Sequence, residues 1–472
     1  MSRTSKLVKN TAILSFGALC TKALMFIMTP IFTRWVAQDD YGTFDLLFTY
    51  ATLLIPLATL SCGEAVFRYM LDADTQKSRK KIVSSATSVC IIGLSILTVL
   101  LLTLSCFWKD GATNIYLLIA LVVSEAIYEF VLMICRGFKR MVLYAASNIL
   151  FSIMMVASVT VFVQGMGMKL EGLIFGYTLA FMVASIVLLI SLRIKDSLSY
   201  RDVSWKVIRK QLRYSIPLIP NSVSWWIVNV SDRTIVSIVL GTSSSAILAV
   251  ANKIPNLCQT IFNVFHISWQ ESASESVDDK DAEEFYQEVF NSMTVVLISI
   301  CAVILSLNYF IFNFLFEQEY FLGFYLTPIL VVSIVVSMLS QFFGGIFIAR
   351  KEPWKNGKTT LIAAAANIVT HLALVGLIGI YASVVSTLVS YLVLGVTRYR
   401  DIRKSYELRF SKLAIVYIMI LLIFCALAYI DNLIVACSAV VVAIMMFLYT
   451  NRATIGKILT KLIGKFTKRS QC

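Results

Sequence analysis

Seven ionisable side chains interrupt long apolar stretches of the sequence, and their types indicate what chemistry they could perform. The seven are Lys22, Glu64, Glu125, Glu129, Asp232, Arg233 and Lys253. A charge buried in a bilayer is costly, so such residues usually face one another or a water-filled cavity. The cations could bind phosphate or carboxylate groups, and the carboxylates could hold a proton or a cation. The set therefore predicts a polar path through a membrane protein.

Two of the acidic residues, Glu125 and Glu129, lie four positions apart and share one face of a helix. Two carboxylates on one face repel each other unless a neighbouring cation or a retained proton relieves the repulsion. The sequence leaves two alternatives open. The pair could load and release a proton or Na⁺, or a partner such as Lys22 could neutralise it in a static structural role. Glu64 and Arg68 are also four positions apart, and this spacing lets them form an ion pair.

The stretch 214–255 concentrates the remaining polar signals. Asp232 and Arg233 are adjacent, so on a helix their side chains point about 100° apart and each needs its own partner. Trp225 and Trp226 lie deeper than an interfacial aromatic belt; they could stack on sugar rings or simply anchor the helix. By depth, Lys22, Glu125 and Lys253 fall near the middle of their spans, Glu64 and Arg68 toward the cytoplasm, and Arg34, Asp232 and Arg233 toward the outer end.

Prolines mark predicted bends in four helices, because proline frees a backbone carbonyl and bends the chain. They are Pro30, Pro56, Pro217, Pro220 and Pro255. They fall in the first, second, seventh and eighth apolar spans, which would open two six-helix lobes as hinged hairpins. Such a parallel repeat about an axis along the membrane normal is typical of transporters, with the path between the lobes. Scattered kinks without a shared role are the alternative.

Apolar runs of about 20 residues predict fourteen membrane-spanning helices. They lie at 10–34, 43–66, 82–107, 114–135, 142–164, 172–192, 214–240, 245–270, 289–308, 320–346, 359–378, 380–397, 413–430 and 433–450. We expect an all-α integral membrane fold of two pseudo-twofold six-helix lobes plus two C-terminal helices. The expected segments are an N-terminal lobe (1–192), a cytoplasmic linker (193–213), a C-terminal lobe (214–398), spans thirteen and fourteen (399–450) and a basic cytoplasmic tail (451–472).

Lysine and arginine are distributed unequally between the two sides of these spans. Of the 41 such residues, 35 precede the first span, follow the last or lie in connections after even-numbered spans, against Arg34, Lys109 and Lys169 on the opposite side. Because Lys and Arg accumulate in cytoplasmic loops, both termini are predicted to be cytoplasmic. The lysines after Asn451 recur about once per helical turn, as in an amphipathic helix lying on anionic lipid.

The composition excludes several function classes. Of the 472 residues 58% are hydrophobic and 14% charged, and the mean hydropathy is +0.82, whereas about a quarter of a soluble domain is charged. The net charge of +14 follows from the loop bias and does not indicate a nucleic-acid partner. The ten cysteines contain no C-x-x-C pair, so neither a metal site nor a redox motif is expected. No G-x-x-x-x-G-K-[ST] site for ATP occurs, and we expect no cofactor.

Two motifs carry a family resemblance. The sequence SIPLIPNSVSWWIVNVSDRTIVSIVLG, residues 215–241, resembles the seventh span of polysaccharide biosynthesis flippases, where a proline-rich entry precedes Ser-Asp-Arg and a closing Gly. The first hairpin is similar through Phe16-Gly17, Pro30, Arg34 and Asp40-Tyr41-Gly42-Thr43-Phe44, although Val36 stands where Leu is usual in the Arg-x-Leu-x-x-x-x-Tyr-Gly turn. The resemblance is to the polysaccharide biosynthesis (PST) family, the Wzx-type O-antigen or oligosaccharide-lipid flippases of the multidrug/oligosaccharidyl-lipid/polysaccharide (MOP, MATE-like) exporter superfamily.

This resemblance implies a transporter rather than an enzyme. It implies that an undecaprenyl-pyrophosphate-linked oligosaccharide, an O-antigen, capsule or exopolysaccharide repeat unit, moves from the cytoplasmic to the outer leaflet by alternating access through a charged central cavity. Energy would come from an H⁺ or Na⁺ gradient or from downstream consumption of the product. The implied setting is the inner membrane of a bacterial cell, with a glycan polymerase and other polysaccharide-assembly proteins as partners.

Three other function classes would make different demands on the sequence. A cation-coupled, MATE-like multidrug or small-molecule antiporter of the same shape would favour an acidic cation site, for which Glu125 and Glu129 are candidates. A membrane-bound glycan polymerase or ligase would need a sizeable outer loop, and the predicted outer loops are all short. A purely structural membrane scaffold would need none of the embedded charges.

Overall fold

The computed structural model describes residues 21–73, 75–107, 111–194 and 198–452. Two compact units divide the chain, Met1–Ala249 and Val250–Cys472, and each is described by itself. The boundary falls inside the eighth predicted span, so unit 1 contains the predicted N-terminal lobe, the predicted linker, the seventh predicted span and the first residues of the eighth. The Phe16-Gly17 motif and all of the predicted basic tail beyond residue 452 lie outside the described residues.

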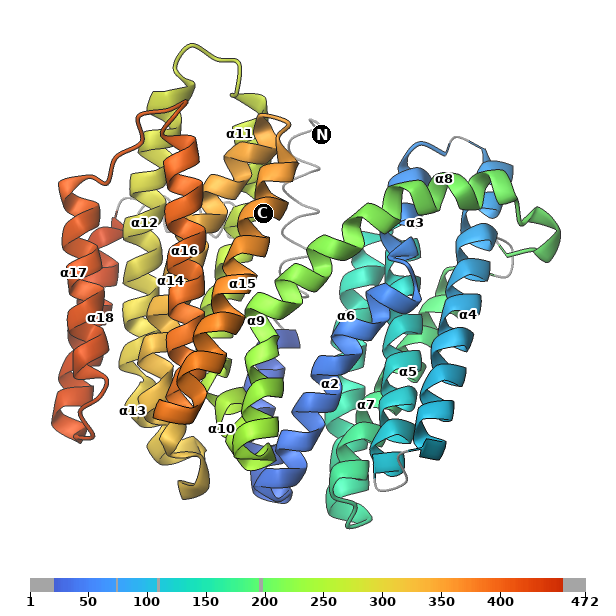
Figure 1. Ribbon diagram of the computed structural model, residues 1–472, viewed down its shortest axis with the longest axis horizontal. Helices are drawn as coiled ribbons and strands as arrows, with labels where there is room; N and C mark the ends of the chain where they lie inside the picture. Colours follow the sequence, from blue (N-terminus) through green and yellow to red (C-terminus); the bar gives the residue numbers. More distant parts are fainter. Residues whose placement is uncertain (1–20, 74, 108–110, 195–197, 453–472) are drawn as a thin grey trace, which may run out of the picture. The chain divides into compact units, whose positions relative to one another are not determined.

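Unit 1 is a bundle of helices arranged around α5 (Figure 1). Residues 21–35 are helical. The elements that follow are α2 (Gln38–Ala58), α3 (Cys62–Leu71), α4 (Gln76–Phe107), α5 (Ala112–Gly137), α6 (Met141–Val159) with a π-helical extension (Thr160–Gly165), α7 (Leu170–Ser191), α8 (Trp205–Ser215), α9 (Ile219–Leu240) and α10 (Thr242–Ala251). α5 packs against α2, α3, α4 and α7, and its most buried positions are apolar. It is therefore the central helix of this unit.

Unit 2 is built around α14, which contacts α11, α12 and α16. Its elements are α11 (Lys253–Glu275), α12 (Ala282–Ser306), α13 (Asn308–Phe310) with a π-helical extension (Ile311–Leu315), α14 (Leu322–Ala349), α15 (Pro353–Ile378), α16 (Tyr381–Ile402), α17 (Lys412–Leu427) and α18 (Leu433–Thr450). α15 and α16 form a tight antiparallel hairpin around Gly379, whose φ of +58° favours glycine. α17 and α18 pack on α12.

Most of the described part of every predicted span falls on helix. Ten described helices are long and apolar enough to cross a membrane, or eleven if Trp205–Val228 and Val230–Leu240, bent by 50°, form one span. α10 and α17 are shorter apolar helices. The all-α membrane fold is confirmed, whereas the count of fourteen spans stays a prediction. The count differs because the first predicted span lies partly outside the described residues, the seventh is bent, the eighth is divided into α10 and α11, and the thirteenth, α17, is short.

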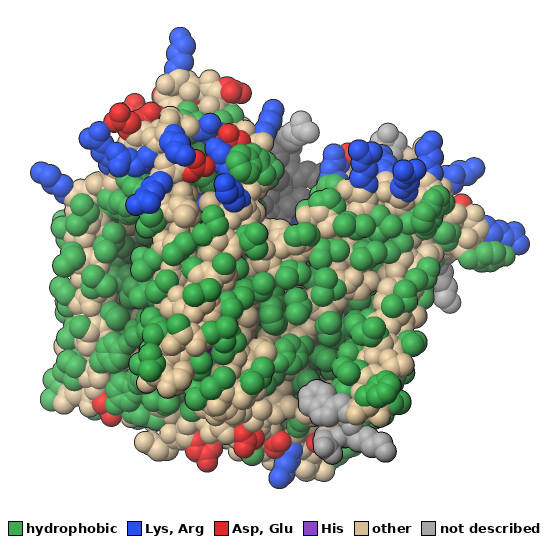
Figure 2. All heavy atoms as spheres, viewed as in Figure 1, with side chains coloured by type: hydrophobic (Ala, Val, Ile, Leu, Met, Phe, Trp, Pro, Cys, Tyr) green, Lys and Arg blue, Asp and Glu red, His purple; other side chains and the backbone are tan. Residues whose placement is uncertain are grey.

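The surface of each unit has an apolar flank and one basic end (Figure 2). In unit 1 the exposed basic side chains of this end include Lys77, Arg79, Lys206, Arg209 and Lys210, from the first turn of α4 and from α8. In unit 2 they include Lys280, Lys351, Arg403, Lys404 and Arg409. Each set comes from loops predicted to be rich in Lys and Arg, as expected where a helix bundle emerges from lipid.

The segment predicted as a linker, 193–213, is fastened to unit 1. The backbone amides of Ser199 and Ser204 donate to the hydroxyls of Ser84 and Ser85, at 2.9 and 3.1 Å. Gln211 Nε2 donates to the carbonyl of Ile82 at 3.0 Å. Because these bonds anchor the segment to α4, α8 is a fixed part of the basic end of unit 1.

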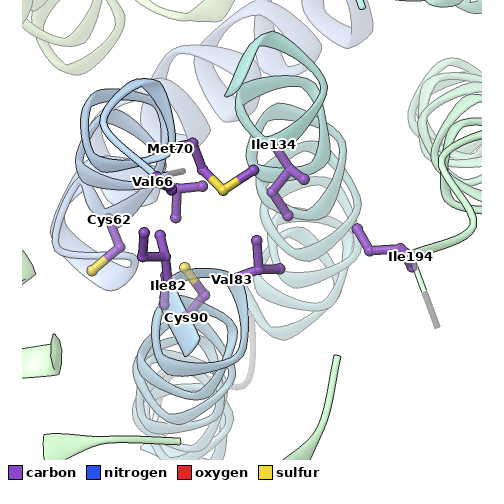
Figure 3. Close-up of a cluster of buried hydrophobic side chains, with 10 residues drawn as sticks. Cys62, Val66, Met70, Ile82, Val83, Cys90, Ile134 and Ile194 are labelled. Carbon is purple, nitrogen blue, oxygen red and sulfur yellow. The ribbon is translucent and has the colours of Figure 1, made fainter. Parts of the chain in front are cut away.

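The second predicted span is broken between α2 and α3. Pro56 cannot donate to the carbonyl one turn before it, and Leu60 and Ser61 adopt left-handed backbone with φ of 50° and 51°. Such backbone is costly for residues other than glycine and persists only where the surroundings fix it. Beyond the break, a buried apolar cluster that includes Val66 and Met70 packs α3 against α4 and α5 (Figure 3).

The other predicted hinges lie close to helix starts. Pro217 falls in the short 3-10 turn before α9, and Pro220 is the second residue of α9. Pro255 is the third residue of α11, just after α10 ends. Proline is tolerated there because the first amides of a helix have no intrahelical acceptor. Pro30 lies within the helical residues 21–35.

Close approach of α4 to the end of α2 depends on a glycine. A Cβ atom on Gly93 would lie 1.9 Å from the carbonyl oxygen of Ala58, which is backbone and cannot rotate away. We predict that Gly93→Ala lowers the free energy of unfolding by about 2 kcal/mol, as overpacking does. Gly376→Ala is the matched control, because its Cβ would meet nothing within 4 Å.

Thermal unfolding of the two purified variants in detergent checks this prediction. The melting temperature should fall for Gly93→Ala and stay level or rise for Gly376→Ala, since alanine favours helix over glycine. Equal melting temperatures for both variants and the wild type would show that α4 can move away from α2 at no cost.

Candidate functional site

The functional residues of unit 1 centre on an ion pair between α2 and α9. Arg233 Nη1 lies 2.7 Å from Asp45 Oδ2, and the two side chains are only 15% and 10% exposed. The same nitrogen is 3.4 Å from the hydroxyl of Thr49. Arg233 Nε is buried and has no hydrogen-bond partner among the described residues. The guanidinium therefore has one firm anionic partner and spare donor capacity.

A second contact joins the start of α2 to the start of α10, at the end of unit 1 opposite its basic end (Figure 1). The hydroxyls of Thr242 and Ser243 donate to Asp39 Oδ1 at 2.7 and 2.5 Å. A Cβ on Gly42 would lie 2.1 Å from the Thr242 carbonyl oxygen, so only glycine lets the backbones approach this closely. In the predicted lobe scheme this contact, like the ion pair, joins helices of different lobes.

A tryptophan of α9 makes a further contact with α2, beside the Arg233–Asp45 ion pair. Trp226 Nε1 donates to the carbonyl of Thr49 on α2 at 3.0 Å. Asp232 is buried, and its Oδ1 accepts from the backbone amide of Arg233 at 2.9 Å. Trp225 is half-buried. The indole of Trp226 thus holds α9 to α2, as expected if this tryptophan anchors the helix. Stacking of either tryptophan on a sugar ring stays a prediction.

A polar cavity of about 270 Å³ lies at the break between α2 and α3. Glu64 from α3 and Glu129 from α5 line it, close enough for their charges to interact. The hydroxyl-bearing residues around them are Thr52, Thr59, Ser61 and Ser222. Carboxylates and hydroxyls are the ligand types of a proton or a hard cation, so this cavity is acidic rather than suited to an anion.

The carboxylate pair predicted from the i, i+4 spacing has two different environments. Glu129 is exposed in the cavity, whereas Glu125 is 6% exposed and its Oε2 has no hydrogen-bond partner among the described residues. The Lys22 ammonium, on an exposed side chain, lies close enough for its charge to act on Glu125. The structure therefore places the predicted partner Lys22 beside one member of the pair.

The remaining predicted site residues lie apart from this group. Arg68 pairs with Asp72 at 2.7 Å rather than with Glu64, on a surface where the two side chains are 48% and 62% exposed. Arg34 is exposed at the end of the helical residues 21–35. Lys253, the first residue of α11, is half-buried and belongs to unit 2. Among the described residues no group of three His, Cys, Asp or Glu side chains could hold a metal ion.

Three residues of the α2 contacts escaped the sequence analysis: Asp45, Asp39 and Thr49. Asp45 lies inside the second predicted span, so counting every ionisable residue within the span limits would have found it. Asp39 lies just outside the span and offers no such signal. Arg398 was counted as a loop residue, yet it is 2% exposed and donates to Thr359, Thr360 and the Ser340 carbonyl, at 3.1 Å in each case.

Comparisons with known proteins identify the family of the chain and similar folds among solved structures. The sequence profile of a family described as "Polysaccharide biosynthesis protein" matches residues 7–269, more than half of the chain. No curated protein sequence matches. Among solved structures, the lipid II flippase MurJ in an inward closed conformation is similar, with a TM-score of 0.70 and 14% identity, over 95% of this chain and 100% of that one.

Two transporters of the MOP superfamily are also similar. An inward-facing multidrug resistance MATE family transporter has a TM-score of 0.63 and 13% identity, over 86% of this chain and 95% of that one. A MOP superfamily transporter from Pyrococcus furiosus has a TM-score of 0.54 and 14% identity, over 89% and 96%. At these identities the similarity establishes the fold, which confirms the MATE-like architecture that the family resemblance implies.

The ion pair of α2 and α9 yields a stability prediction. Asp45→Asn leaves the Arg233 guanidinium without its anionic partner, and breaking a buried pair costs about 3 kcal/mol. Asp72→Asn is the matched control, because it makes the same chemical change in an exposed pair worth at most about 1 kcal/mol. We expect a clear drop in melting temperature for the first variant and almost none for the second.

A double-mutant cycle with Arg233→Met separates the contribution of the ion pair to the free energy of unfolding from the cost of burying an unpaired Arg233 guanidinium. The double variant Asp45→Asn with Arg233→Met should be more stable than Asp45→Asn alone, because no uncompensated cation remains. If the two Asp→Asn variants melt alike, the Arg233–Asp45 contact contributes nothing to the stability of unit 1.

Proposed function

Because the chain belongs to the polysaccharide biosynthesis protein family, we propose that it flips an undecaprenyl-pyrophosphate-linked oligosaccharide from the cytoplasmic to the outer leaflet of a bacterial inner membrane. One observation carries the proposal: this family membership coincides with the fold of a lipid II flippase over 95% of the chain. The sugars and phosphates of such a lipid cannot cross hydrocarbon unaided. The similar solved structures are flippases and transporters rather than enzymes.

The cations of the first and seventh predicted spans provide the chemistry for the head group. Lys22 has an exposed side chain, and Arg233 keeps an unused donor at Nε. Ammonium and guanidinium groups form strong charge-assisted hydrogen bonds with phosphate. We assign Lys22, Arg233 and, from unit 2, Lys253 to this role. A pyrophosphate that approaches Arg233 would compete with Asp45 for the guanidinium.

That competition supplies a mechanism for alternating access. The contacts of Asp39 with Thr242 and Ser243, and of Asp45 with Arg233, close the outer end of unit 1 in the proposed orientation, with the basic ends in the cytoplasm. Substrate binding at Arg233 weakens one of the two contacts and so favours opening. The breaks at Pro56 and before α9 are the points where the helices can bend without unfolding.

Ion coupling is assigned to the acidic cavity and the buried carboxylate beside it. Glu129 and Glu64 face the cavity, and Glu125 is linked electrostatically to Lys22. H⁺ or Na⁺ could bind there as the α2–α3 break changes shape. The proposed protein partners are a glycan polymerase and other polysaccharide-assembly proteins.

A second candidate function rests on the same cavity. An acidic, hydroxyl-lined pocket of about 270 Å³ suits an organic cation, as in a cation-coupled multidrug antiporter of the MATE type. The two candidates differ in the charge of the cargo. An antiporter would move cationic dyes and ignore Lys22, whereas a flippase for a pyrophosphate-linked lipid depends on cations.

Transport in proteoliposomes tests the proposal with a fluorescent undecaprenyl-pyrophosphate-linked oligosaccharide. Lys22→Ala should lower the initial rate at least about tenfold, the equivalent of one lost charge-assisted hydrogen bond. Lys22→Arg should retain most of the rate because it keeps the charge. Lys169→Ala is the control, since Lys169 lies just before α7, outside the proposed binding group.

Two results would contradict the proposal. One is equal transport by wild type, Lys22→Ala and Lys169→Ala, which would show that the Lys22 ammonium does not bind the head group. The other is transport of a cationic dye with no movement of the lipid-linked sugar by the wild type, which would favour the antiporter.

A further inference from the structure

The helix α11 of unit 2 carries polar side chains along most of its length. The helix spans Lys253–Glu275, 23 residues, and is therefore about 34 Å long, enough to cross a hydrocarbon core of about 30 Å. It is nevertheless not among the ten described helices that are also apolar enough to do so. The reason is a set of uncharged polar residues that recur at helical spacing: Asn256, Gln259, Thr260, Asn263, His266 and Gln270.

These six residues, called the polar face below, lie on one side of α11. At 100° per residue their side chains fall within an arc of about 120°, in which Ile267 is the one apolar residue of that stretch. On the opposite side Cys258, Phe262 and Trp269 are at most 2% exposed. The Trp269 indole donates to the carbonyl of Phe342 on α14 at 2.9 Å. Packing on α14 thus turns the polar face away from the apolar core of unit 2.

One edge of the polar face is held in place by α14. Gln259 Nε2 donates to Asn263 Oδ1 at 2.7 Å, and Gln341 Nε2 of α14 donates to Gln259 Oε1 at 3.3 Å. His266 Nε2 lies 3.1 Å from the carbonyl oxygen of Gln341. Asn256 and Asn263 are exposed. The contacts orient the amide groups before any ligand arrives, which lowers the entropy cost of binding.

The chemistry of the polar face matches the hydroxyl groups of a sugar. Each amide side chain has two donors and an acceptor, and the Thr260 hydroxyl can both donate and accept. Polar groups that face hydrocarbon without partners are costly, so in a membrane this face requires water or a polar ligand. From Ile254 to Gln270 the sequence contains no Lys, Arg, Asp or Glu. The face therefore offers no cation to an acidic sugar.

The order of groups along α11 matches the order of groups in a lipid-linked oligosaccharide. Lys253, assigned above to the pyrophosphate, is the first residue of the helix. The polar face begins one turn later at Asn256 and continues for roughly 21 Å to Gln270. In the lipid, the first sugar is bonded to the pyrophosphate itself. A head group bound at Lys253 would therefore place the sugars against the polar face.

We propose that the polar face of α11 is the site that recognises the sugars of the cargo, and that it selects oligosaccharides built from uncharged hexoses and N-acetylhexosamines. The exposed amides of Asn256 and Asn263 hydrogen-bond to the sugar hydroxyls. A uronic acid would lose hydration of its carboxylate at this face without gaining a cation. The inference rests on the proposed function, because it takes the lipid-linked oligosaccharide as the ligand.

Binding to purified protein in lipid nanodiscs tests the site with three fluorescent probes. The first is undecaprenyl pyrophosphate, the second is the same lipid carrying a disaccharide of N-acetylhexosamines, and the third carries a hexuronic acid as its second sugar. We expect the wild type to bind the neutral disaccharide lipid at least about fivefold more tightly than the sugar-free lipid, the equivalent of one hydrogen bond. The acidic disaccharide lipid should bind at least about tenfold more weakly than the neutral one.

Asn256→Leu and Asn263→Leu each remove one amide with little change in volume. Each should raise the Kd for the neutral disaccharide lipid about fivefold and leave the Kd for undecaprenyl pyrophosphate unchanged. A merely structural role would alter both Kd values alike. Asn313→Leu is the matched control, because it makes the same change at an exposed asparagine of unit 2 outside α11. It should alter neither value.

Labelling with a water-soluble maleimide tests the face without any ligand, in membrane fragments that are open to both sides. Asn263→Cys should react, whereas Ile261→Cys, exposed on the apolar side of the same helix turn, should not. Peptide mapping by mass spectrometry separates both positions from the ten native cysteines. An unreactive Asn263→Cys would overturn the inference even if the leucine variants do not fold.

Equal Kd values of the wild type and both leucine variants for the neutral disaccharide lipid would also overturn the site. Equal or tighter binding of the acidic disaccharide lipid would overturn the selection of uncharged sugars. If the variants lose sugar binding as expected but the wild type transports no lipid-linked sugar, the proposed function fails and this site stands. If sugar is transported and the leucine variants bind it as the wild type does, only this inference fails.

Discussion

The arrangement of unit 1 depends on one ion pair, between Asp45 on α2 and Arg233 on α9. Both groups lose most of their hydration in the folded protein, so each requires a partner for as long as it is buried. The two helices cannot drift apart gradually, because intermediate positions would leave two buried charges unpaired. Only two arrangements leave no buried charge unpaired. In one the ion pair is formed, and in the other water solvates Asp45 while water or an anionic ligand binds Arg233. In the proposed transport cycle, a contact with these properties would act as a switch rather than as a permanent link between the two helices.

The helix breaks explain how such a switch can move. α3 is held by the apolar cluster of Figure 3 and by α8, while α2 ends at Ala58, just before the left-handed backbone of Leu60 and Ser61. In the proposed transport cycle, α2 would tilt at this break while α3 keeps its packing. The same break exposes Glu64 to a cavity that Glu129 also lines, so a change in the tilt of α2 alters the surroundings of both carboxylates. This links the acidic cavity to the ion pair by a mechanical route within unit 1.

The sequence predicts the fold well because the bilayer restricts it: long apolar runs had to be helices, and their positions agree with the structure. Proline signalled the break after Pro56 for the same local reason. The ion-pair partner of each charged residue was not predictable from the sequence. Arg68 was free to pair with Glu64 or Asp72 at equal spacing, and the Arg233–Asp45 pair joins residues 188 positions apart.

Cross-linking the outer end of unit 1 tests the central claim, that α2 must leave α9 and α10 during each transport cycle. Asp39→Cys and Ser243→Cys replace two side chains already in contact, and a short, cleavable reagent that reacts with two thiols can join them. The account predicts that cross-linked protein in proteoliposomes transports at least about tenfold more slowly and that reductive cleavage restores the rate. The reagent should leave unaffected the wild type, with its ten native cysteines, and each variant that carries only one of the two introduced cysteines. Undiminished transport by fully cross-linked protein would contradict the account.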